Sequence, residues 1–234
     1  MGGNAFMKSI ADSSRRGREA AIFKEITAGN LPDFLRQFKS IPLAGDNLQG
    51  TIEVMPDYLA IGSDEDFVRI PMTPQTAQRI ANQFGCTLPT RKMVDAIDAA
   101  AETRLAPQPL TEDRESVAAF VLSNERIERQ RAGKPLGALT IGAKKDVVLS
   151  PRIHQRPDRV AIYGWRQLDG RPIQPLTTVH VNWYVDYSHG VRLVRDQMTI
   201  NDKPASIAEV LQDQALASLI SDEGPIKPPR YPDK

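Results

Sequence analysis

The sequence predicts an α+β fold, in which a helical N-terminal half packs on a mainly antiparallel sheet from the C-terminal half. Apolar residues recur at helical spacing through much of residues 13–132, whereas the alternation typical of strands dominates after Gly137. Of the 234 residues, 41% are hydrophobic, which is enough for a sizeable core. We expect an N-terminal helical arm over residues 1–40, a single domain over residues 41–224 and a Pro-rich tail over residues 225–234.

The N-terminal arm is predicted to contain two helices within residues 13–38. The first carries an apolar stripe and ends at Gly29, and the second opens at Pro32. The stripe consists of Ala20, Ile22, Phe23 and Ile26. Amphipathic helices of this kind usually pack on their own domain, and the alternative is that the arm binds a protein partner.

Residues 51–70 alternate in strand fashion and predict a three-strand meander. Its strands are expected over residues 51–55, 58–61 and 67–70. The acidic turn at residues 63–66 lacks the ligand pattern of a calcium loop, so we interpret it as a solvated turn.

Three helices are predicted next. Thr73, followed by a proline, is a typical helix start, and Gly85 ends that helix. Thr90 caps a second helix. Residues 111–132 form the longest predicted helix, and its charged C-terminal part is expected to face solvent.

Strands are predicted for most of the remaining chain, before short helices and the tail. The candidate strands are residues 139–141, 146–149, 159–165, 178–187 and 191–198. Two short helices are expected over residues 205–212 and 214–219. The tail at residues 225–234, which is rich in proline, is expected to be an extended strap or disordered.

Charge and composition exclude several functions. Lys and Arg number 30 and Asp and Glu number 29, so the chain lacks the basic field that a nucleic-acid partner requires. It contains no apolar run of about 18 residues, so we expect no membrane span. A single cysteine, Cys86, excludes an intramolecular disulfide. We expect a soluble, cytoplasmic protein, unless a leader peptide was removed ahead of Met1.

Residues 180–195 concentrate titratable and aromatic side chains, and here we place the candidate catalytic site. His180, Asp186 and His189 are the residues assigned to it. Two imidazoles and a carboxylate either act as a base oriented by an acid, or bind zinc, or satisfy buried backbone groups. The spacing matches no short metal motif, so we assign no metal and no cofactor.

Further side chains are assigned to substrate binding, as an aromatic wall with basic residues beside it. They are Tyr163, Trp165, Tyr184, Tyr187, Arg192 and Lys144. The aromatic residues serve equally well as core, and the Lys144-Lys145 pair is more often solvated than bound to an anion. Cys86 lies ahead of the helix that starts at Thr90, but a lone cysteine is usually a small buried apolar group.

Four segments from Lys145 onward follow one another in an order that can be compared with a known family. They are Asp146-Val147-Val148, Arg159-Val160-Ala161-Ile162-Tyr163, Asp169-Gly170-Arg171-Pro172-Ile173 and Gly190-Val191-Arg192-Leu193. In this order they resemble the second half of papain-like cell-wall cysteine peptidases and amidases. The family's catalytic pair is not carried over, because Arg159 stands at the position of its histidine and Cys86 lacks the Asp-Cys-Ser neighbourhood.

The resemblance implies a bacterial-type hydrolase of amide or glycosidic bonds in a polymer of the cell-envelope type. His180 or His189 would be the base, Asp186 would orient it, and the aromatic side chains would hold a small-molecule or polymer substrate. The alternative is a non-catalytic binding or scaffold module that uses the same aromatic surface or the N-terminal arm.

Overall fold

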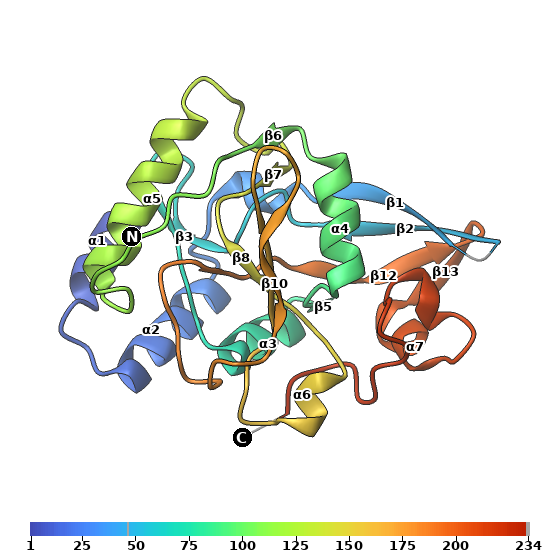
Figure 1. The fold of residues 1–234 in the computed structure, drawn as a ribbon. Coiled ribbons are helices and arrows are strands. Elements are labelled where there is room, and N and C mark those ends of the chain that lie inside the picture. Colours follow the sequence, from blue (N-terminus) through green and yellow to red (C-terminus); the bar gives the residue numbers. More distant parts are fainter. Residues whose placement is uncertain (46, 233–234) are drawn as a thin grey trace.

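The computed structural model describes residues 1–45 and 47–232, and helices and strands alternate along this whole length (Figure 1). The helices are α1 (Gly3–Ser9), α2 (Arg15–Thr27), α3 (Pro74–Gln83), α4 (Arg91–Ala100), α5 (Val117–Arg131), α6 (Arg152–Gln155) and α7 (Ile207–Gln212), with 3-10 turns η1 (Asp33–Arg36) and η2 (Ala217–Leu219). The strands are β1 (Lys39–Gly45), β2 (Leu48–Val54), β3 (Ala60–Gly62), β4 (Phe67–Arg69), β5 (Cys86–Thr87), β6 (Thr103–Arg104), β7 (Thr140–Ile141), β8 (Lys145–Val147), β9 (Ile162–Arg166), β10 (Pro172–Thr177), β11 (His189–Gly190), β12 (Val194–Ile200) and β13 (Lys203–Ser206).

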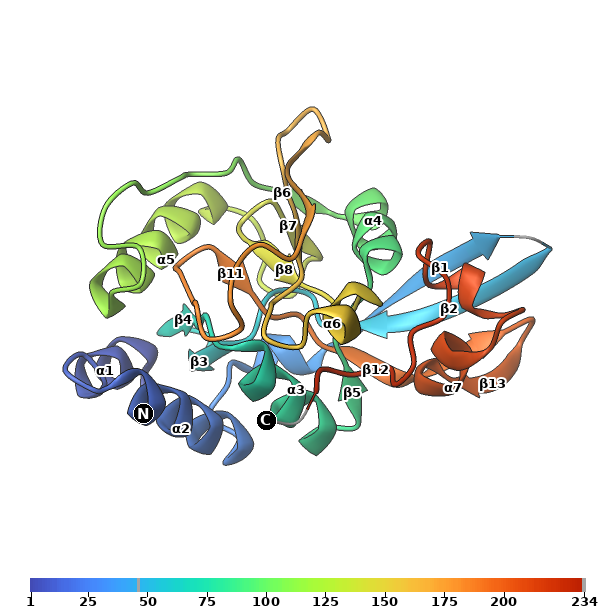
Figure 2. The ribbon, with the colours of Figure 1, turned by 60° about the horizontal axis from the view of Figure 1, so that its bottom comes forward.

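The larger sheet has the strand order β1-β2-β12-β13, and β5 also pairs with β12. Its pairs are antiparallel, with Ile52 opposite Ile41 on one side and Met198 on the other. Figure 2 shows this sheet extending away from helices α1, α2 and α5. The α+β class with antiparallel sheets is therefore confirmed. The predicted division into a helical N-terminal half and a C-terminal sheet is not, because β1, β2 and β5 share a sheet with β12 and β13.

The meander predicted over residues 51–70 is wrong at its first strand. β3 and β4 form an antiparallel pair, but β2 lies between β1 and β12. After β2 the backbone continues beside the segment that leads into β12, since Met55 N–H donates to the Leu193 carbonyl and Leu59 N–H to the Val191 carbonyl. Because of these bonds the chain does not fold back directly after β2, and β2 does not pair with β3.

Capping side chains explain where the helices begin. Helices α3, α4 and α5 are each preceded by a residue whose hydroxyl accepts a hydrogen bond from the backbone N–H group three residues later in the chain. These capping residues are Thr73, Thr90 and Ser116. The longest predicted helix was expected from residue 111, but α5 starts at Val117 because Ser116 supplies its cap.

The N-terminal helices contribute to the same core as the sheets. Phe6 and Met7 of α1 are buried, as are Ile22 and Ile26 of α2, and all four belong to the main apolar cluster. Gly3 N–H donates to the Asp66 carbonyl at 2.9 Å, which fixes α1 on the β3–β4 hairpin. In the described residues, no helix is both long and apolar enough to cross a membrane.

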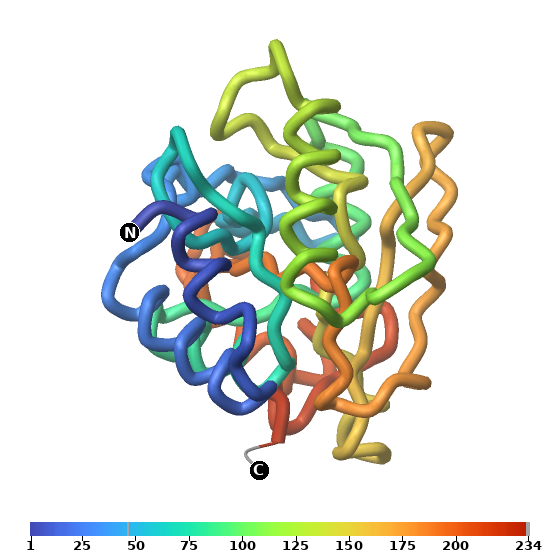
Figure 3. Tube along the Cα trace, turned by 90° about the vertical axis from the view of Figure 1, so that its left-hand side faces the viewer, coloured from blue at the N-terminus to red at the C-terminus, as the bar shows by residue number. Residues whose placement is uncertain are grey.

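A second sheet carries the candidate site, with the strand order β10-β9-β8-β11. β8 is central and pairs antiparallel with β9 and parallel with β11. The β9–β10 hairpin runs along the edge of the molecule (Figure 3). Beside this sheet the C-terminal segment is fixed by Tyr231, whose buried hydroxyl donates to the Val148 carbonyl at 2.8 Å.

The strand predicted over residues 178–187 is not formed, and this segment is a loop with turns in which Val181 makes one isolated antiparallel bridge with Arg159. Its backbone pairs with residues 158–160 only around that bridge, and beyond it the partners change. Asn182 N–H donates to the Asp158 carbonyl, and Tyr187 N–H donates to the Arg114 carbonyl. At its end the Asp186 carboxylate accepts from Ser188 N–H at 2.9 Å, a local bond that competes with strand pairing.

Candidate functional site

The loop before β11 places the predicted catalytic residues beside β8. The register of the second sheet sets Lys145 between two neighbours, Gly164 of β9 and His189 of β11. Side chains of paired positions in neighbouring strands share a face, so Lys145 and His189 lie side by side. The loop then brings His180, Tyr184 and Asp186 to the same region.

Asp186 is the buried anion of this site. Its Oδ1 accepts from Ser188 Oγ at 2.5 Å, and its Oδ2 accepts from Arg114 Nη2 at 2.6 Å and Tyr184 Oη at 3.2 Å. Burial alone would raise the pKa of this carboxyl, but the interactions with His189, Ser188 and the neighbouring cations lower it to about 2. Asp186 is therefore ionised at neutral pH.

His189 is fully buried, and neither ring nitrogen has a protein hydrogen-bond partner in the described structure. Burial lowers the pKa of His189 to about 4, against the opposing effect of Asp186, so the ring is neutral at neutral pH. A neutral imidazole offers one donor and one acceptor, and leaving such groups unpaired costs roughly 1–3 kcal/mol each. A buried group of this kind requires an explanation, such as a catalytic role or a bound water or ion.

His180 and Tyr184 form the solvent-reachable side of the cluster, because both rings are only partly buried. They stack with ring centroids 4.6 Å apart, and the His189 centroid lies 6.3 Å from His180 and 5.9 Å from Tyr184. Burial, with the charge of Lys145, lowers the pKa of His180. Burial and the nearby Asp186 raise the pKa of Tyr184 to about 12, so the phenol keeps its proton.

Lys145 and Trp165 complete the cluster. Lys145 Nζ lies 5.4 Å from the Trp165 ring, and burial lowers the pKa of this lysine against the effect of Asp186. Trp165 is buried, and its Nε1 also lacks a hydrogen-bond partner among the described residues. Its φ of 52° is in the left-handed region, which is uncommon for a bulky residue.

Two predicted binding residues form a wall behind this cluster. The Tyr187 ring packs on Trp165 with centroids 6.3 Å apart, and Lys144 Nζ donates to the Tyr187 carbonyl at 2.5 Å. Both side chains are buried, so they support the cluster without facing solvent.

Two other predicted binding residues lie elsewhere. Tyr163 Oη donates to Asp95 of α4 at 2.8 Å, because Gly164 and Trp165 have positive φ and break the alternation along β9. Arg192 is buried and donates to the carbonyls of Met55 and Thr140. Both therefore hold structural elements together.

The expected hydrogen bond from an imidazole to Asp186 is not formed, since the carboxylate bonds to Ser188, Arg114 and Tyr184. Asp186 instead fixes the Tyr184 phenol, and Tyr184 stacks on His180. Any orientation of His180 by the acid is consequently indirect.

The arrangement suits proton transfer better than metal binding. Two neutral imidazoles, an ammonium and a phenol lie together, which supplies both proton acceptors and donors. Among the described residues, no group of three or more His, Cys, Asp and Glu side chains is placed to hold a metal ion. The site offers a single carboxylate, whereas most glycosidases place two around the scissile bond.

Three participants were not predicted from the sequence: Arg114, Ser188 and, as a member of the site itself, Lys145. Lys145 stood out only as half of a basic pair, and pairing of β8 with β11 is what directs it to His189. Arg114 comes from the connector ahead of α5, 72 positions before Asp186, and no local pattern marks it.

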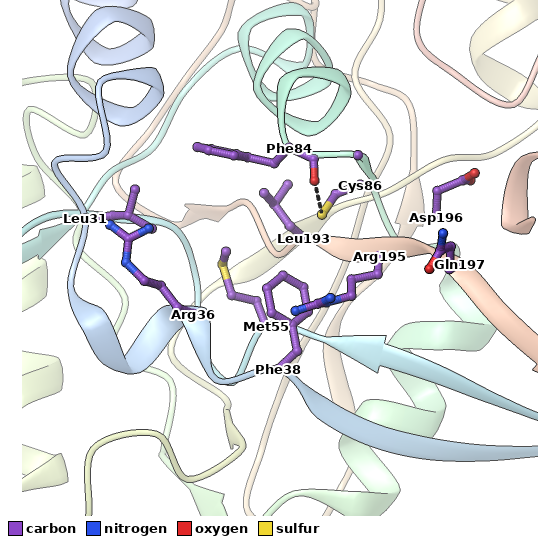
Figure 4. A pocket seen from close by; sticks show the side chains of 11 residues that line it. Leu31, Arg36, Phe38, Met55, Phe84, Cys86, Leu193, Arg195, Asp196 and Gln197 are labelled. Atoms are coloured by element: carbon purple, nitrogen blue, oxygen red, sulfur yellow. Dashed lines mark hydrogen bonds between the residues drawn. The ribbon is translucent and has the colours of Figure 1, made fainter.

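Cys86 lies in a different part of the molecule. β5 places it opposite Arg195 of β12, and the thiol donates to the Phe84 carbonyl at 3.4 Å (Figure 4). It is buried, and burial raises the pKa of the thiol to about 11, so it is protonated at neutral pH. It lines a cavity of about 530 Å³ whose lining, in the described part of the chain, includes no histidine.

Comparisons with protein-family models, with curated proteins and with solved structures find no match to this chain.

Proposed function

We propose that the protein is a hydrolase of amide bonds, in a polymer of the cell-envelope type, and that the cluster of His180, Tyr184, His189 and Lys145 is its active site. One observation carries this proposal. The buried imidazole of His189 has two unpaired nitrogens, and it adjoins a second imidazole and a phenol that reach solvent. Amide hydrolysis is preferred to glycoside hydrolysis because Asp186 is the only carboxylate that bonds within this cluster of described residues.

The proposed reaction begins with water attacking the amide carbonyl carbon, while His180 accepts the proton that the water loses. The carbonyl oxygen becomes an oxyanion, and the Lys145 ammonium stabilises it. The C–N bond then breaks, His180 returns its proton to the amine nitrogen, and a carboxylic acid and an amine are released.

The lowered pKa of His180 suits this role. A base must be unprotonated, and an imidazole with a pKa below its ordinary 6.5 is largely neutral at neutral pH. Asp186 would act as a positioning residue, because its bond to Tyr184 fixes the phenol on which His180 stacks.

His180→Gln is expected to lower kcat by at least about 100-fold, because the amide cannot accept the proton from water. The measurement is release of primary amines from cell-wall peptides and from acylated dipeptide amides. His154→Gln is the matched control, since this imidazole bonds to the Pro228 carbonyl from a partly buried position on α6.

The control variant should keep the parent rate, and thermal unfolding should show that both variants fold. Amine release by the parent that persists unchanged in His180→Gln would refute the role of His180. A parent that releases no amine from any of these substrates would refute the hydrolase itself.

A binding module is the second candidate, and a different surface favours it. Val179 and Trp183 flank His180 and are 63% and 51% exposed. Arg15 of α2 lies over the Trp183 ring at 4.4 Å, so this aromatic surface adjoins the N-terminal helices. In that case Trp183→Ala would abolish capture of cell-wall peptides, and His180→Gln would leave capture unchanged.

A further inference from the structure

The cavity beside Cys86 has the size and composition of a small-molecule site. Its volume of about 530 Å³ lies within the range of about 300–1,000 Å³ that is usual for ligand pockets. Figure 4 shows the side chains around it, which come from η1 and the residues on either side of it, from the segment after β2, from the end of α3, from β5, and from β12 with the residue before it. Phe38, Met55, Phe84 and Leu193 supply apolar surface.

The charged side chains around this cavity differ in whether they have a partner. Asp196 is engaged elsewhere, because its carboxylate accepts from Ser206 Oγ at 2.8 Å and from Ala208 N–H at 3.0 Å. Arg36 pairs with Asp33 on the exposed surface. Arg195, in contrast, makes no ion pair or hydrogen bond through its side chain within the residues that the structure describes. Arg195 is therefore the cationic side chain of this cavity that is left without an ion pair in the described structure.

The position of Arg195 is fixed even though its charge is unpaired. Its guanidinium carbon lies 4.6 Å from the centroid of the Phe38 ring, and Figure 4 shows the side chain extending over this ring between Met55 and Gln197. Stacking on an aromatic face leaves the N–H groups at the edge of the guanidinium free to donate. A carboxylate is the anion whose two oxygens match this planar donor edge.

We propose that this cavity binds a small carboxylic acid with an apolar body, such as a medium-chain or aryl acid, in its ionised form. Arg195 pairs with the carboxylate, and Phe38, Met55, Phe84 and Leu193 contact the apolar body. The proposal is independent of the hydrolase site, because it uses none of the residues of the histidine cluster.

The test measures binding of decanoate by calorimetry and, separately, by protection of Cys86. Because Cys86 is the only cysteine and lines the cavity, its alkylation with iodoacetamide at alkaline pH, where more of the thiol is ionised, reports whether the cavity is occupied. Decanoate should bind one site and slow the alkylation. Decanol, which keeps the chain without the charge, and acetate, which keeps the charge without the chain, should each bind at least about 10-fold more weakly.

Arg195→Gln should weaken decanoate binding at least about 10-fold, because it removes the charge that pairs with the carboxylate. Arg171→Gln is the control, since Arg171 lies on the β9–β10 turn with its side chain 76% exposed. It should leave both binding and protection unchanged. Arg195 is itself exposed, so its substitution should not impair folding.

Two results would overturn the proposal. In the first, decanoate and decanol protect Cys86 equally and Arg195→Gln changes neither, which would mean that the cavity takes up apolar chains without recognising a charge. In the second, decanoate neither binds nor protects at millimolar concentration.

Discussion

Arg69→Met is expected to lower the free energy of unfolding by about 3–5 kcal/mol, because it leaves a buried carboxylate without its partner. Arg69 is fully buried, and its Nη2 donates to Asp57 Oδ2 at 2.6 Å. Its Nη1 donates to Asn124 at 3.1 Å and to Glu128 at 2.8 Å. This network ties β4 to α5 and to the turn that follows β2, so methionine would fill the space without the bonds.

The pH dependence of this loss separates charge from packing. Burial raises the pKa of Asp57, but the charge and hydrogen bonds of Arg69 outweigh it, so the net pKa is lowered from 3.8. In the parent, Asp57 therefore stabilises the fold above the unfolded-state pKa, and this stability is lost as the pH falls through the folded-state value. In Arg69→Met the unpaired carboxyl becomes easier to protonate, so acid should relieve part of the destabilisation.

Urea unfolding at neutral pH and near pH 4 measures both effects. Arg171→Met serves as the control, since it removes an arginine whose nearest carboxylate, on Asp169, is 4.0 Å away at the surface. Exposed pairs of this kind contribute about 0–1 kcal/mol. A loss for Arg69→Met that is no larger than the loss for this control, or that grows in acid, would contradict the account of Asp57.

Helices α2, α3, α4 and α5 could be predicted from the sequence because their signals are local, whereas α1 lies in a segment without a strong pattern and was not predicted. Thr73 and Thr90 each accept the hydrogen bond that a capping residue provides, and the glycine that was expected to end α3, Gly85, has a φ of 62°. The antiparallel pairing of β2 with β12 joins positions such as Ile52 and Met198, which no short-range pattern relates. The sequence therefore predicted the class but not the order of strands.

Residues 178–187 show why alternation alone is an unreliable signal. Val179, Val181, Trp183, Val185 and Tyr187 alternate as in a strand, but burial does not follow them. Val179 and Trp183 are 63% and 51% exposed, whereas Val185 is 1% exposed. Burial is set by where the loop meets the segment before α5, since Tyr187 N–H donates to the Arg114 carbonyl and Tyr187 Oη accepts from Leu110 N–H.

The proximity of His180 and His189 could be predicted because it depends on a short separation in the sequence. His180, Asp186 and His189 are close in sequence, so a strand or a loop keeps them near one another. What the sequence does not specify is how Asp186 is used. Arg114 arrives from the connector before α5 and occupies an oxygen of the carboxylate, which was expected to bond to an imidazole.

Lys144→Met is expected to change how the free energy of unfolding depends on pH. The amine is fully buried, and burial lowers the pKa of Lys144 to about 7, against the attraction of Asp186 and Asp57. Its hydrogen bond to the Tyr187 carbonyl at 2.5 Å is compatible with either protonation state, because a neutral amine also donates.

The direction follows from proton binding. Above about pH 7 the folded state releases the proton of Lys144, whereas the unfolded chain keeps it until about pH 10.4. The unfolded state therefore binds more protons in this interval, so the stability of the parent rises with pH. Between about pH 7 and pH 9.5 the gain from this one group is about 3 kcal/mol, since each pKa unit corresponds to about 1.4 kcal/mol. Lys144→Met lacks this gain.

The informative quantity is the difference in unfolding free energy between parent and variant, measured by urea unfolding across this interval. It should move in favour of the parent by about 3 kcal/mol as the pH rises. Differencing removes the contributions of the other titrating groups, which the two proteins share. Lys203→Met, at an exposed position of β13, controls for loss of one lysine. The two curves of unfolding free energy against pH could instead stay parallel from about pH 7 to 9.5. That result would mean that the fold holds Lys144 in its charged form. The attraction of the buried anions Asp57 and Asp186 would then outweigh the cost of removing the ammonium from water.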